Sequence, residues 1–516
     1  MLELERVLDS IKNINTNIAR NIILFIGDGM SLPTVTAGRI YKAQQIDNLK
    51  DAEGNLLTFE KFPHIALSKT YCVDKQTPDS ASTASAIFTG VKTNFLTMGF
   101  DNSVEPMNPD SQDTAKKVDG IMKWAHEAGK DIGFVTNTRI THATPAALYA
   151  HVADRAWECD RKAVDKNNKT NIEDINLQLV RRNPGRYAKV VLGGGRESWC
   201  PGTADGSMIN KCYKHPPRPA SSWNCSRLDG VDVIDEFLKK NENLEEFKNM
   251  NGKYVSNRAE LLDVDSKKVD YLLGLFSESY MKYESEREND TSPDKEPSLS
   301  EMTEAAIKIL RKNKKGFFLM VEGGKIDKAH HQNLANQALH ETAALDKAVE
   351  KALSLIDTQE TLVIVTADHG HTMSIAGYQS RGADIRGLVD SQTADDNKPY
   401  MILSYASGPG FRDKFKIDNN QINRVDLNTW GNYTDFNFKN PSSWPGTLWS
   451  SLVPNGYNSS DETHSGADVG IFATGPYSHL FQSVHEQSYI AYVMAYSACI
   501  GLYKNHSHCT ETSENF

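Results

Sequence analysis

The sequence predicts an α/β fold, in which a doubly wound, mostly parallel central sheet carries helices on both faces. Short apolar runs of four to six residues recur along the chain, as expected of strands buried on both faces of a parallel sheet. Segments with the apolar spacing of amphipathic helices lie between these runs. Such strand–helix alternation is typical of doubly wound sheets. The length of 516 residues fits about three average domains, or one large α/β domain with insertions.

Six apolar runs predict strands, and two long patterns predict helices most clearly. The runs are 21–29, 132–138, 190–195, 317–324, 362–370 and 469–475. The helical patterns are 303–313 and 335–356. Residues 4–18 also place apolar side chains at helical spacing. This N-terminal helix could pack on the subunit's own core or reach a second subunit as an arm, and the sequence favours neither.

Residues 376–463 differ in composition from the rest of the chain. Glycine, proline, asparagine, aspartate and aromatic residues dominate there, and the apolar runs are brief. We interpret this stretch as an insertion or a small subdomain. The predicted organisation is therefore an N-terminal arm (1–20), an α/β core (21–375 and 464–516) and an inserted subdomain (376–463).

Composition narrows the class of protein. Hydrophobic residues make up 39% of the chain and charged residues 24%, as in ordinary soluble globular proteins. A net charge of −10 argues against a nucleic-acid-binding surface or an anionic-membrane surface, although a local positive pocket remains compatible with it. No apolar run reaches the length of a membrane span. The first residues lack a signal-peptide pattern and the last lack an anchor tail, which is compatible with a mature or trimmed form.

Cysteines and glycosylation sequons indicate the compartment. None of the seven cysteines forms a CxxC pair, so a zinc ribbon is not expected. The pairing of Cys159, Cys200, Cys212 and Cys225 stays open at this point. Six N-glycosylation sequons occur, at Asn168, Asn224, Asn289, Asn432, Asn458 and Asn505. Together with pairable cysteines they favour a secreted or cell-surface protein.

Three of the predicted strands end in acidic residues, namely Asp28, Glu322 and Asp368. The carboxyl ends of parallel strands form the ligand crevice of such sheets. One acid there could be a helix cap, but three clustered carboxylates would repel one another and be desolvated at large cost unless cations neutralise them. The sequence therefore predicts a metal centre.

Further candidate ligands occur in the motifs that follow these strands. Asp327 and His331 are four residues apart, which places both on one face of a helix. Aspartate with histidine is a zinc-type set, whereas carboxylates with a hydroxyl and water suit magnesium. The remaining candidates are His142, Thr144, His369 and His464, with Arg155 nearby. On the residues alone, His142, His330 and His371 are interpreted as groups that support ligands.

Asp79 and Ser80 precede a run of small residues, 77–90, that predicts a helix. For an isolated Asp–Ser pair, a plain N-cap is the better interpretation. A serine at a helix N-terminus also lies at the positive end of the helix dipole. Beside a zinc ion its hydroxyl can ionise and act as a nucleophile, with the metal in the role of the base.

Six motifs together resemble the alkaline phosphatase family in its animal-type form. They are LFIGDGMS, TPDSASTASAIFTGVKTN, THATPAALYAHVADR, FFLMVEGGKIDKAHH, VTADHGH and ETHSGADVGIFATGP. Each motif alone is modest, but all six in the family's order are highly specific, and they span residues 21–475.

The resemblance implies a role for each matched residue. Ser80 is implied as the nucleophile that becomes phosphorylated, and Arg155 as the guanidinium fork that grips two phosphate oxygens. The first zinc site is implied at Asp327, His331 and His464, and the second at Asp28, Ser80, Asp368 and His369. The magnesium site is implied at Asp28, His142, Thr144 and Glu322.

Other expectations concern the surroundings of this site. Lys328 stands where most animal-type members have histidine, while bacterial members carry lysine there and use it near phosphate through water. Asp461 is expected near the mouth of the site, and residues 376–463 resemble the family's crown-like surface domain near the dimer interface. Phe276 and Glu296 fit the family's calcium site, but Ser277 replaces a glutamate, which weakens the case for calcium.

The family's terminal disulfide fits Cys499–Cys509, and Cys72 is expected to be free. The resemblance also implies a homodimer, to which the N-terminal helix could contribute an arm. A lipid-anchored membrane association is compatible with the family but not visible in this chain.

The implied activity is broad hydrolysis of small phosphate monoesters through a phosphoserine, with two zinc ions and one magnesium ion. One alternative is a related metal-dependent phosphodiesterase or sulfatase, which would use threonine or a modified cysteine or serine. The DSAS motif and the separate magnesium set argue against it. Another alternative is a surface receptor or binding protein on the same scaffold, yet neither Ser80, Arg155 nor any zinc ligand is missing.

Overall fold

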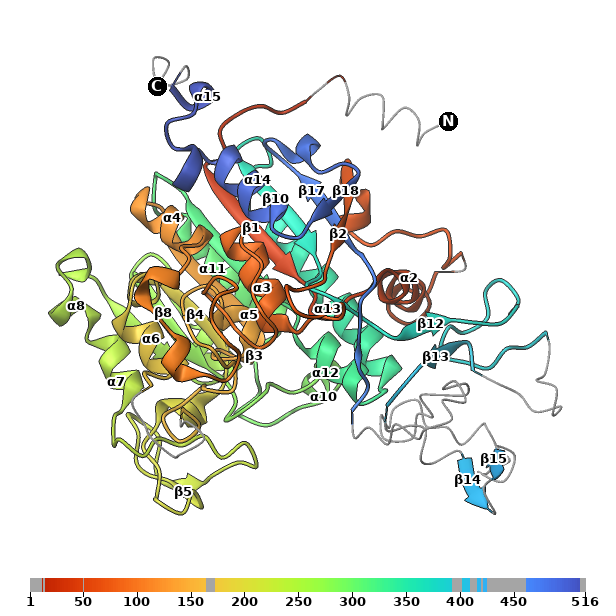
Figure 1. Cartoon of the computed structure of the whole chain (residues 1–516), viewed down its shortest axis with the longest axis horizontal. Coiled ribbons are helices and arrows are strands. Elements are labelled where there is room, and N and C mark those ends of the chain that lie inside the picture. The colour runs from red at the N-terminus through yellow and green to blue at the C-terminus, as the bar shows by residue number, and fades with distance from the viewer. Residues whose placement is uncertain are drawn as a thin grey trace.

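The computed structural model describes residues 12, 14–49, 51–163, 172–391, 401–408, 415–418, 421–424 and 461–510. A ten-stranded sheet runs through the centre of the molecule (Figure 1). Its order is β18 (Val484–Glu486), β2 (His64–Lys69), β17 (Val469–Thr474), β10 (Thr361–Thr366), β1 (Asn21–Ile26), β9 (Phe317–Glu322), β3 (Asp131–Arg139), β4 (Val190–Gly194), β8 (Tyr271–Leu275) and β7 (Gly252–Val255).

The sheet is mostly parallel, as predicted. Every neighbouring pair from β10 to β7 is parallel. Strand β17 runs antiparallel to both β10 and β2, and β18 pairs parallel with β2 at the edge. All six predicted strands are present, and the central β1, β9 and β10 are buried along their whole length. Strands β2, β7, β8 and β18 were not among the predicted runs.

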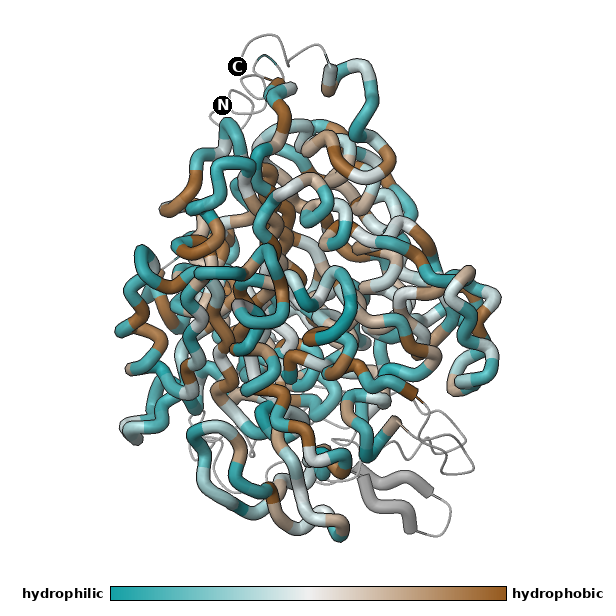
Figure 2. The backbone as a smooth tube through the Cα atoms, turned by 90° about the vertical axis from the view of Figure 1, so that its left-hand side faces the viewer, coloured by the Kyte–Doolittle hydropathy of each residue, from teal (hydrophilic) through white to brown (hydrophobic). Residues whose placement is uncertain are grey.

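Helices cover both faces of the sheet, so the side chains of β1 enter two different cores. Ile22 and Leu24 pack with residues of α3 (Ser80–Thr89) and α14 (Tyr489–Ser497). Ile23 and Phe25 pack with residues of α11 (Leu299–Leu310) and α13 (Ala335–Leu353). In Figure 2 the hydrophobic segments gather inside the molecule, and the outer loops are largely hydrophilic. These findings confirm the doubly wound α/β fold.

Three predicted helices are present with small shifts of their ends. The pattern at 303–313 belongs to α11, which begins earlier because Ser298 and Glu301 form a capping box. The pattern at 335–356 is α13. The small-residue run forms α3, which Asp79 caps by accepting the backbone N–H groups of Ala81 and Ser82.

The predicted N-terminal helix is wrong over its last residues, since residues 14–18 are irregular. The Asn15 side chain donates to the carbonyls of Thr358 (3.4 Å) and Gln359 (3.2 Å). The Asn15 carbonyl accepts the backbone N–H of Tyr477 (2.8 Å). These partners beyond the segment replace the bonds that a helix would make. Residues 1–11 and 13 lie outside the described residues.

The described parts of 376–463 contain short β elements. Strand β12 (Met373–Ile375) pairs with β13 (Leu403–Tyr405), and β14 (Phe415–Asp418) pairs with β15 (Gln421–Arg424). Residues 392–400, 409–414, 419–420 and 425–460 lie outside the described residues. The inserted subdomain, with these boundaries, therefore stays a prediction.

Three disulfide bonds join six of the seven cysteines. Cys499 pairs with Cys509, as the resemblance implied, and Cys72 is free and buried. The other four cysteines, whose pairing the sequence left open, form the bonds Cys159–Cys225 and Cys200–Cys212. None of the helices among the described residues is long and apolar enough to cross a membrane.

Candidate metal centre

Three neighbouring strands bring their acidic ends to one edge of the sheet. Ile26 of β1 pairs with Thr366 of β10 and with Glu322 of β9. Asp28 and Asp368 each lie two residues beyond those strand ends. All three carboxylates, on Asp28, Glu322 and Asp368, are completely buried. The predicted clustering of acids at the carboxyl ends of the strands is therefore present.

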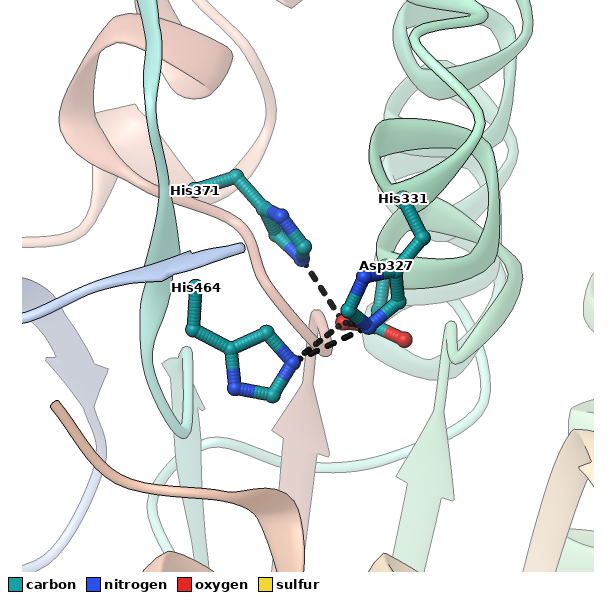
Figure 3. A group of neighbouring side chains, drawn as sticks. All are labelled: Asp327, His331, His371 and His464. Carbon is teal, nitrogen blue, oxygen red and sulfur yellow. Dashed lines mark hydrogen bonds and ion pairs between the residues drawn. The ribbon is translucent and has the colours of Figure 1, made fainter. Parts of the chain in front are cut away.

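The first group of candidate ligands is shown in Figure 3. Asp327 and His331 lie on α12 (Lys325–His331), one turn apart as their spacing predicted. His464 comes from β16 (His464–Ser465), and His371 from β11 (Gly370–His371). The Oδ1 atom of Asp327 lies 3.3 Å from Nε2 of His331 and 3.3 Å from Nε2 of His464. One potential ligand atom from each of the four residues lies within 4.8 Å of the others.

Two of these histidines are held in one tautomer by backbone carbonyls. Nδ1 of His331 lies 2.6 Å from the carbonyl of Glu462, and Nδ1 of His464 lies 2.8 Å from the carbonyl of Pro78. Because a carbonyl only accepts, each Nδ1 carries a hydrogen, and in the neutral ring each Nε2 then carries the lone pair. The two Nε2 atoms lie 3.0 Å apart beside the Asp327 carboxylate. This donor set fits a bound cation.

His371 differs from the other two histidines because both of its nitrogens face carboxylates. Its Nε2 lies 2.7 Å from Oδ1 of Asp327, and its Nδ1 contacts Oε2 of Glu462. Burial opposes a charge on His371, but Glu462 and Asp327 outweigh it and raise the pKa of His371 to about 9. His371 is therefore suited to donate to Asp327 and hold it, in agreement with its interpretation as a supporting group.

The second group contains Asp28, Asp368 and His369, with Ser80 beside them. Ser80 is the first residue of α3, and its Oγ lies 3.1 Å from Nε2 of His369 and 3.4 Å from Oδ1 of Asp28. Nε2 of His369 also lies 3.2 Å from Oδ2 of Asp368. The backbone N–H groups of Gly29 (3.1 Å) and His369 (2.8 Å) hold the other oxygen of Asp368. The candidate nucleophile thus borders a second potential metal position.

The third group contains Asp28, His142 and Glu322, with Thr144 on α5 (Ala143–Ala146). One oxygen of Glu322 accepts from Thr138 (3.1 Å) and from Thr136. Among the described residues, its other oxygen, Oε1, and Oγ1 of Thr144 are buried without a hydrogen bond of ordinary geometry. Buried polar atoms without partners are costly, and a carboxylate with a hydroxyl suits magnesium. This group therefore also fits a cation.

Three buried carboxylates of the centre, on Asp28, Asp368 and Glu322, lie in surroundings that disfavour their charged form. Burial, with the nearby carboxylates of Asp368 and Asp327, raises the pKa of Asp28 well above its usual value. Burial likewise raises the pKa of Asp368, and it raises that of Glu322 to about 7. A cation bound there would oppose these shifts, because it stabilises the charged form of each carboxylate.

Arg155 lies between the first residues of α3 and the third group. Its guanidinium donates to Oδ2 of Asp79 (3.1 Å) and to Nε2 of His142 (3.2 Å). Burial opposes its charge, but the carboxylates of Asp79 and Asp28 outweigh this and raise the pKa of Arg155. The guanidinium is therefore a fixed positive charge beside Ser80.

Two residues expected near substrate lie at the rim. Lys328 is partly exposed next to Asp327 on α12. The positive charge of Lys328 acts on His142. Burial is the largest cause that lowers the pKa of His142, and the charges of Arg155, Arg139 and Lys328 lower it further. Asp461 is exposed and directly precedes Glu462.

Glu462 is the buried carboxylate that the sequence interpretation missed. It contacts both His331 and His371 and is only 1% exposed. Its position in ETH, two residues before His464, is the signal that could have found it.

The fold and these three groups define an α/β protein with clustered metal-binding side chains at the carboxyl ends of its central strands. A family model described as alkaline phosphatase matches residues 19–500. The chain belongs to the alkaline phosphatase family and is a phosphatase, which confirms the resemblance drawn from its motifs.

Relatives and solved structures agree with this assignment. The chain is 40% identical over 503 residues to the human tissue-nonspecific alkaline phosphatase isozyme, covering 98% of this chain and 88% of that protein. It is 42% identical over 485 residues to alkaline phosphatase 4 of Drosophila melanogaster, covering 94% and 77%. The structure of Thermus thermophilus alkaline phosphatase matches with a TM-score of 0.62 at 21% identity, covering 94% of this chain and 92% of that one. That likeness shows the same fold.

Proposed function

We propose that the protein hydrolyses phosphate monoesters with broad specificity through a phosphoserine on Ser80, at a centre of two zinc ions and one magnesium ion. The observation that carries this proposal is the position of the Ser80 hydroxyl. It lies at the N-terminus of α3, 3.1 Å from Nε2 of His369 and 3.4 Å from the Asp28 carboxylate. Family membership supplies the class of reaction.

In this proposal each group of side chains holds one ion. The first zinc ion is held by Asp327, His331 and His464. The second is held by Asp28, Asp368 and His369 with Ser80, and magnesium by Asp28, His142, Thr144 and Glu322. Ions bound there supply Lewis-acid stabilisation of the attacking and leaving oxygens. For magnesium there is a parallel in a mutant TAB5 alkaline phosphatase, which is described with Mg bound in the M3 site.

The reaction follows from what the chain's own groups do. Oγ of Ser80 gives up its proton to solvent and attacks phosphorus, an Oγ–P bond forms, the bond to the leaving oxygen breaks, and the leaving alkoxide takes a proton from water to become the alcohol. Water then cleaves the phosphoserine and releases phosphate. Arg155, fixed by Asp79, binds two phosphoryl oxygens through its planar fork. Because these contacts read only the phosphoryl group, many alcohols are accepted.

Lys328 and Asp461 contribute at the rim in the same proposal. Lys328 adds a positive charge near phosphate, one residue beyond the ligand Asp327 on α12. Asp461 lies at the mouth, where the leaving alcohol departs.

The compartment and assembly belong to the same proposal. Three disulfide bonds support an oxidising environment, hence an extracellular or cell-surface location. The silkworm relative is named a membrane-bound alkaline phosphatase, in line with a lipid-anchored association of this protein. We propose a homodimer that acts on small phosphate esters and has no nucleic-acid-binding surface, consistent with the net charge of −10.

Hydrolysis of a chromogenic phosphate monoester at alkaline pH tests the function. The protein is assayed with zinc and magnesium, after chelation, and after return of the metals, with a phosphodiester in parallel. We expect monoester activity that disappears with the chelator and returns with the metals. An inactive metal-loaded protein would contradict the proposal and favour a binding role. Preferential cleavage of the diester would favour a phosphodiesterase.

A further inference from the structure

Glu462 joins two histidines of the first group through separate parts of the residue. Its carbonyl accepts from Nδ1 of His331 (2.6 Å), and its N–H donates to the carbonyl of His331 (2.7 Å). Its side chain contacts the second histidine, with Oε2 next to Nδ1 of His371. The backbone of Glu462 therefore orients one imidazole and its carboxylate orients another.

The second carboxylate oxygen of Glu462 is also held in place. Oε1 accepts the backbone N–H of Thr372 (2.7 Å) and contacts the Thr372 hydroxyl. That hydroxyl in turn accepts the N–H of Ala406 (3.1 Å). A buried carboxylate is stabilised when both oxygens have partners, and here the partners also fix its direction.

The contact to His371 continues to a proposed metal ligand. Nε2 of His371 lies 2.7 Å from Oδ1 of Asp327, so a line of hydrogen-bonding groups runs from Glu462 through His371 to Asp327. A residue that fixes the orientation of metal ligands in this way raises the affinity of a site without touching the ion.

We infer that Glu462 is a positioning residue for the first zinc site: its backbone sets His331, and its carboxylate sets Asp327 through His371. This inference deepens the proposed function and rests on it. A change of the side chain alone removes the hold on Asp327 and leaves the backbone contact with His331 in place. The expected effect is thus weaker zinc retention, with the phosphoryl-transfer steps intact once zinc is bound.

The test compares the zinc-loaded wild type with Glu462→Gln, which keeps the size of the side chain, and with Glu462→Ala. Glu341→Gln is the matched control. Glu341 is also 1% exposed, and its carboxylate accepts from Asn137 (2.9 Å) and from the N–H of Glu284 (2.6 Å), with no hydrogen bond to a proposed ligand. The rate at which zinc passes to a colorimetric chelator is measured, then activity as zinc is added back. Circular dichroism checks the fold.

We expect Glu462→Gln to bind the first zinc about 10–100-fold more weakly, to release it faster by a similar factor, and to regain its kcat when zinc is added in excess. Glu341→Gln should release zinc like the wild type. The inference is overturned if Glu462→Gln retains zinc like the wild type, if Glu341→Gln loses zinc equally fast, or if excess zinc does not restore kcat. A wild type that holds zinc without activity would overturn the proposed function alone, and one that holds no zinc would overturn both.

Discussion

The Nε2 atoms of His331 and His464 face each other across 3.0 Å. While both rings are neutral neither can donate to the other, because backbone carbonyls hold the hydrogen of each ring on Nδ1. The fold thus brings two ring nitrogens and a carboxylate together, and burying such groups costs folding free energy unless hydrogen bonds or a cation compensate them. In the proposed centre a bound cation would supply that compensation.

Metal removal should make stability depend on pH in a defined direction. Without metal, the pKa of Glu322 is raised to about 7 and that of Asp28 is also raised. Since unfolded carboxylates titrate near pH 4, the folded metal-free protein binds these protons more tightly. Protonation of these carboxylates therefore stabilises the folded metal-free protein. This stabilisation is fully present below about pH 4 and is lost as the pH rises through about 7.

We therefore expect the Tm of the chelated protein to fall between pH 5.5 and pH 8, and that of the metal-loaded protein to fall less. Calorimetry on both forms measures this. Glu322→Gln is the control, since it removes one of the titrating groups and should flatten the slope of the metal-free form. A metal-free Tm that rises over this interval would contradict the expectation.

Replacing the proposed nucleophile should abolish turnover. Ser80→Ala removes the oxygen that forms the bond to phosphorus, so kcat should fall by at least about 10³-fold. Steady-state kinetics and trapping of labelled phosphoenzyme measure this. Ser85→Ala, on the same helix, should stay active, because its hydroxyl bonds only the backbone of Ala81 and Gly99. Labelled phosphoenzyme in Ser80→Ala would refute the assignment.

Arg155→Lys tests whether the guanidinium fork matters beyond its charge. A lysine cannot hold two phosphoryl oxygens and keep the contacts to Asp79 and His142. Losing a charge-assisted hydrogen bond costs about 1.5–3 kcal/mol, so kcat/KM should fall about 10–100-fold. Inhibition by inorganic phosphate should weaken as well. Arg161→Lys should change neither quantity, because within the described part of the chain its side chain donates to the backbone carbonyls at 203, 204 and 226.

The long-range disulfide should contribute more stability than the terminal one. Cys159–Cys225 spans 66 residues, whereas Cys499–Cys509 spans 10. Because closing a longer loop restricts the unfolded chain more, replacing the first pair by serine should cost about 2–5 kcal/mol and the second less. Guanidinium unfolding midpoints of the two double variants compare them. The opposite order would show that native packing, and not loop closure, decides the effect.

The central strands could be predicted because burial on both faces leaves an uninterrupted apolar run. Strand β2 was missed since it alternates, with Ile65 half exposed on an outer strand. Strand β18 has only three residues and gives no periodic signal. The antiparallel direction of β17 could not be predicted either, because an apolar run indicates a buried strand but not the orientation of that strand in the sheet. The helix predicted up to residue 18 is absent over residues 14–18, because the side chain of Asn15 bonds residues more than 340 positions away.

The candidate ligands were predictable because each follows a strand or shares a helix turn. Asp28, Glu322 and Asp368 needed only the rule that parallel strands end at one edge. For Glu462 the local signal is its place in ETH, two residues before His464, but its contact with His331, 131 positions away, becomes visible only in the folded structure. The resemblance implied the roles of the ligands, whereas the supporting position of Glu462 is seen only in the three-dimensional structure.

The antiparallel strand also sets an order of assembly during synthesis. Strand β17 fills the place between β10 and β2, and β2 was made some 400 residues earlier. A growing chain therefore exposes the open edge of β10 until residues 469–474 leave the ribosome, and an open edge invites pairing with the wrong strand. His464 arrives with the same segment. The proposed first zinc site therefore gains its last ligand, His464, just ahead of the strand that closes the gap between β10 and β2, so the site and this part of the sheet are completed at the same late stage of synthesis.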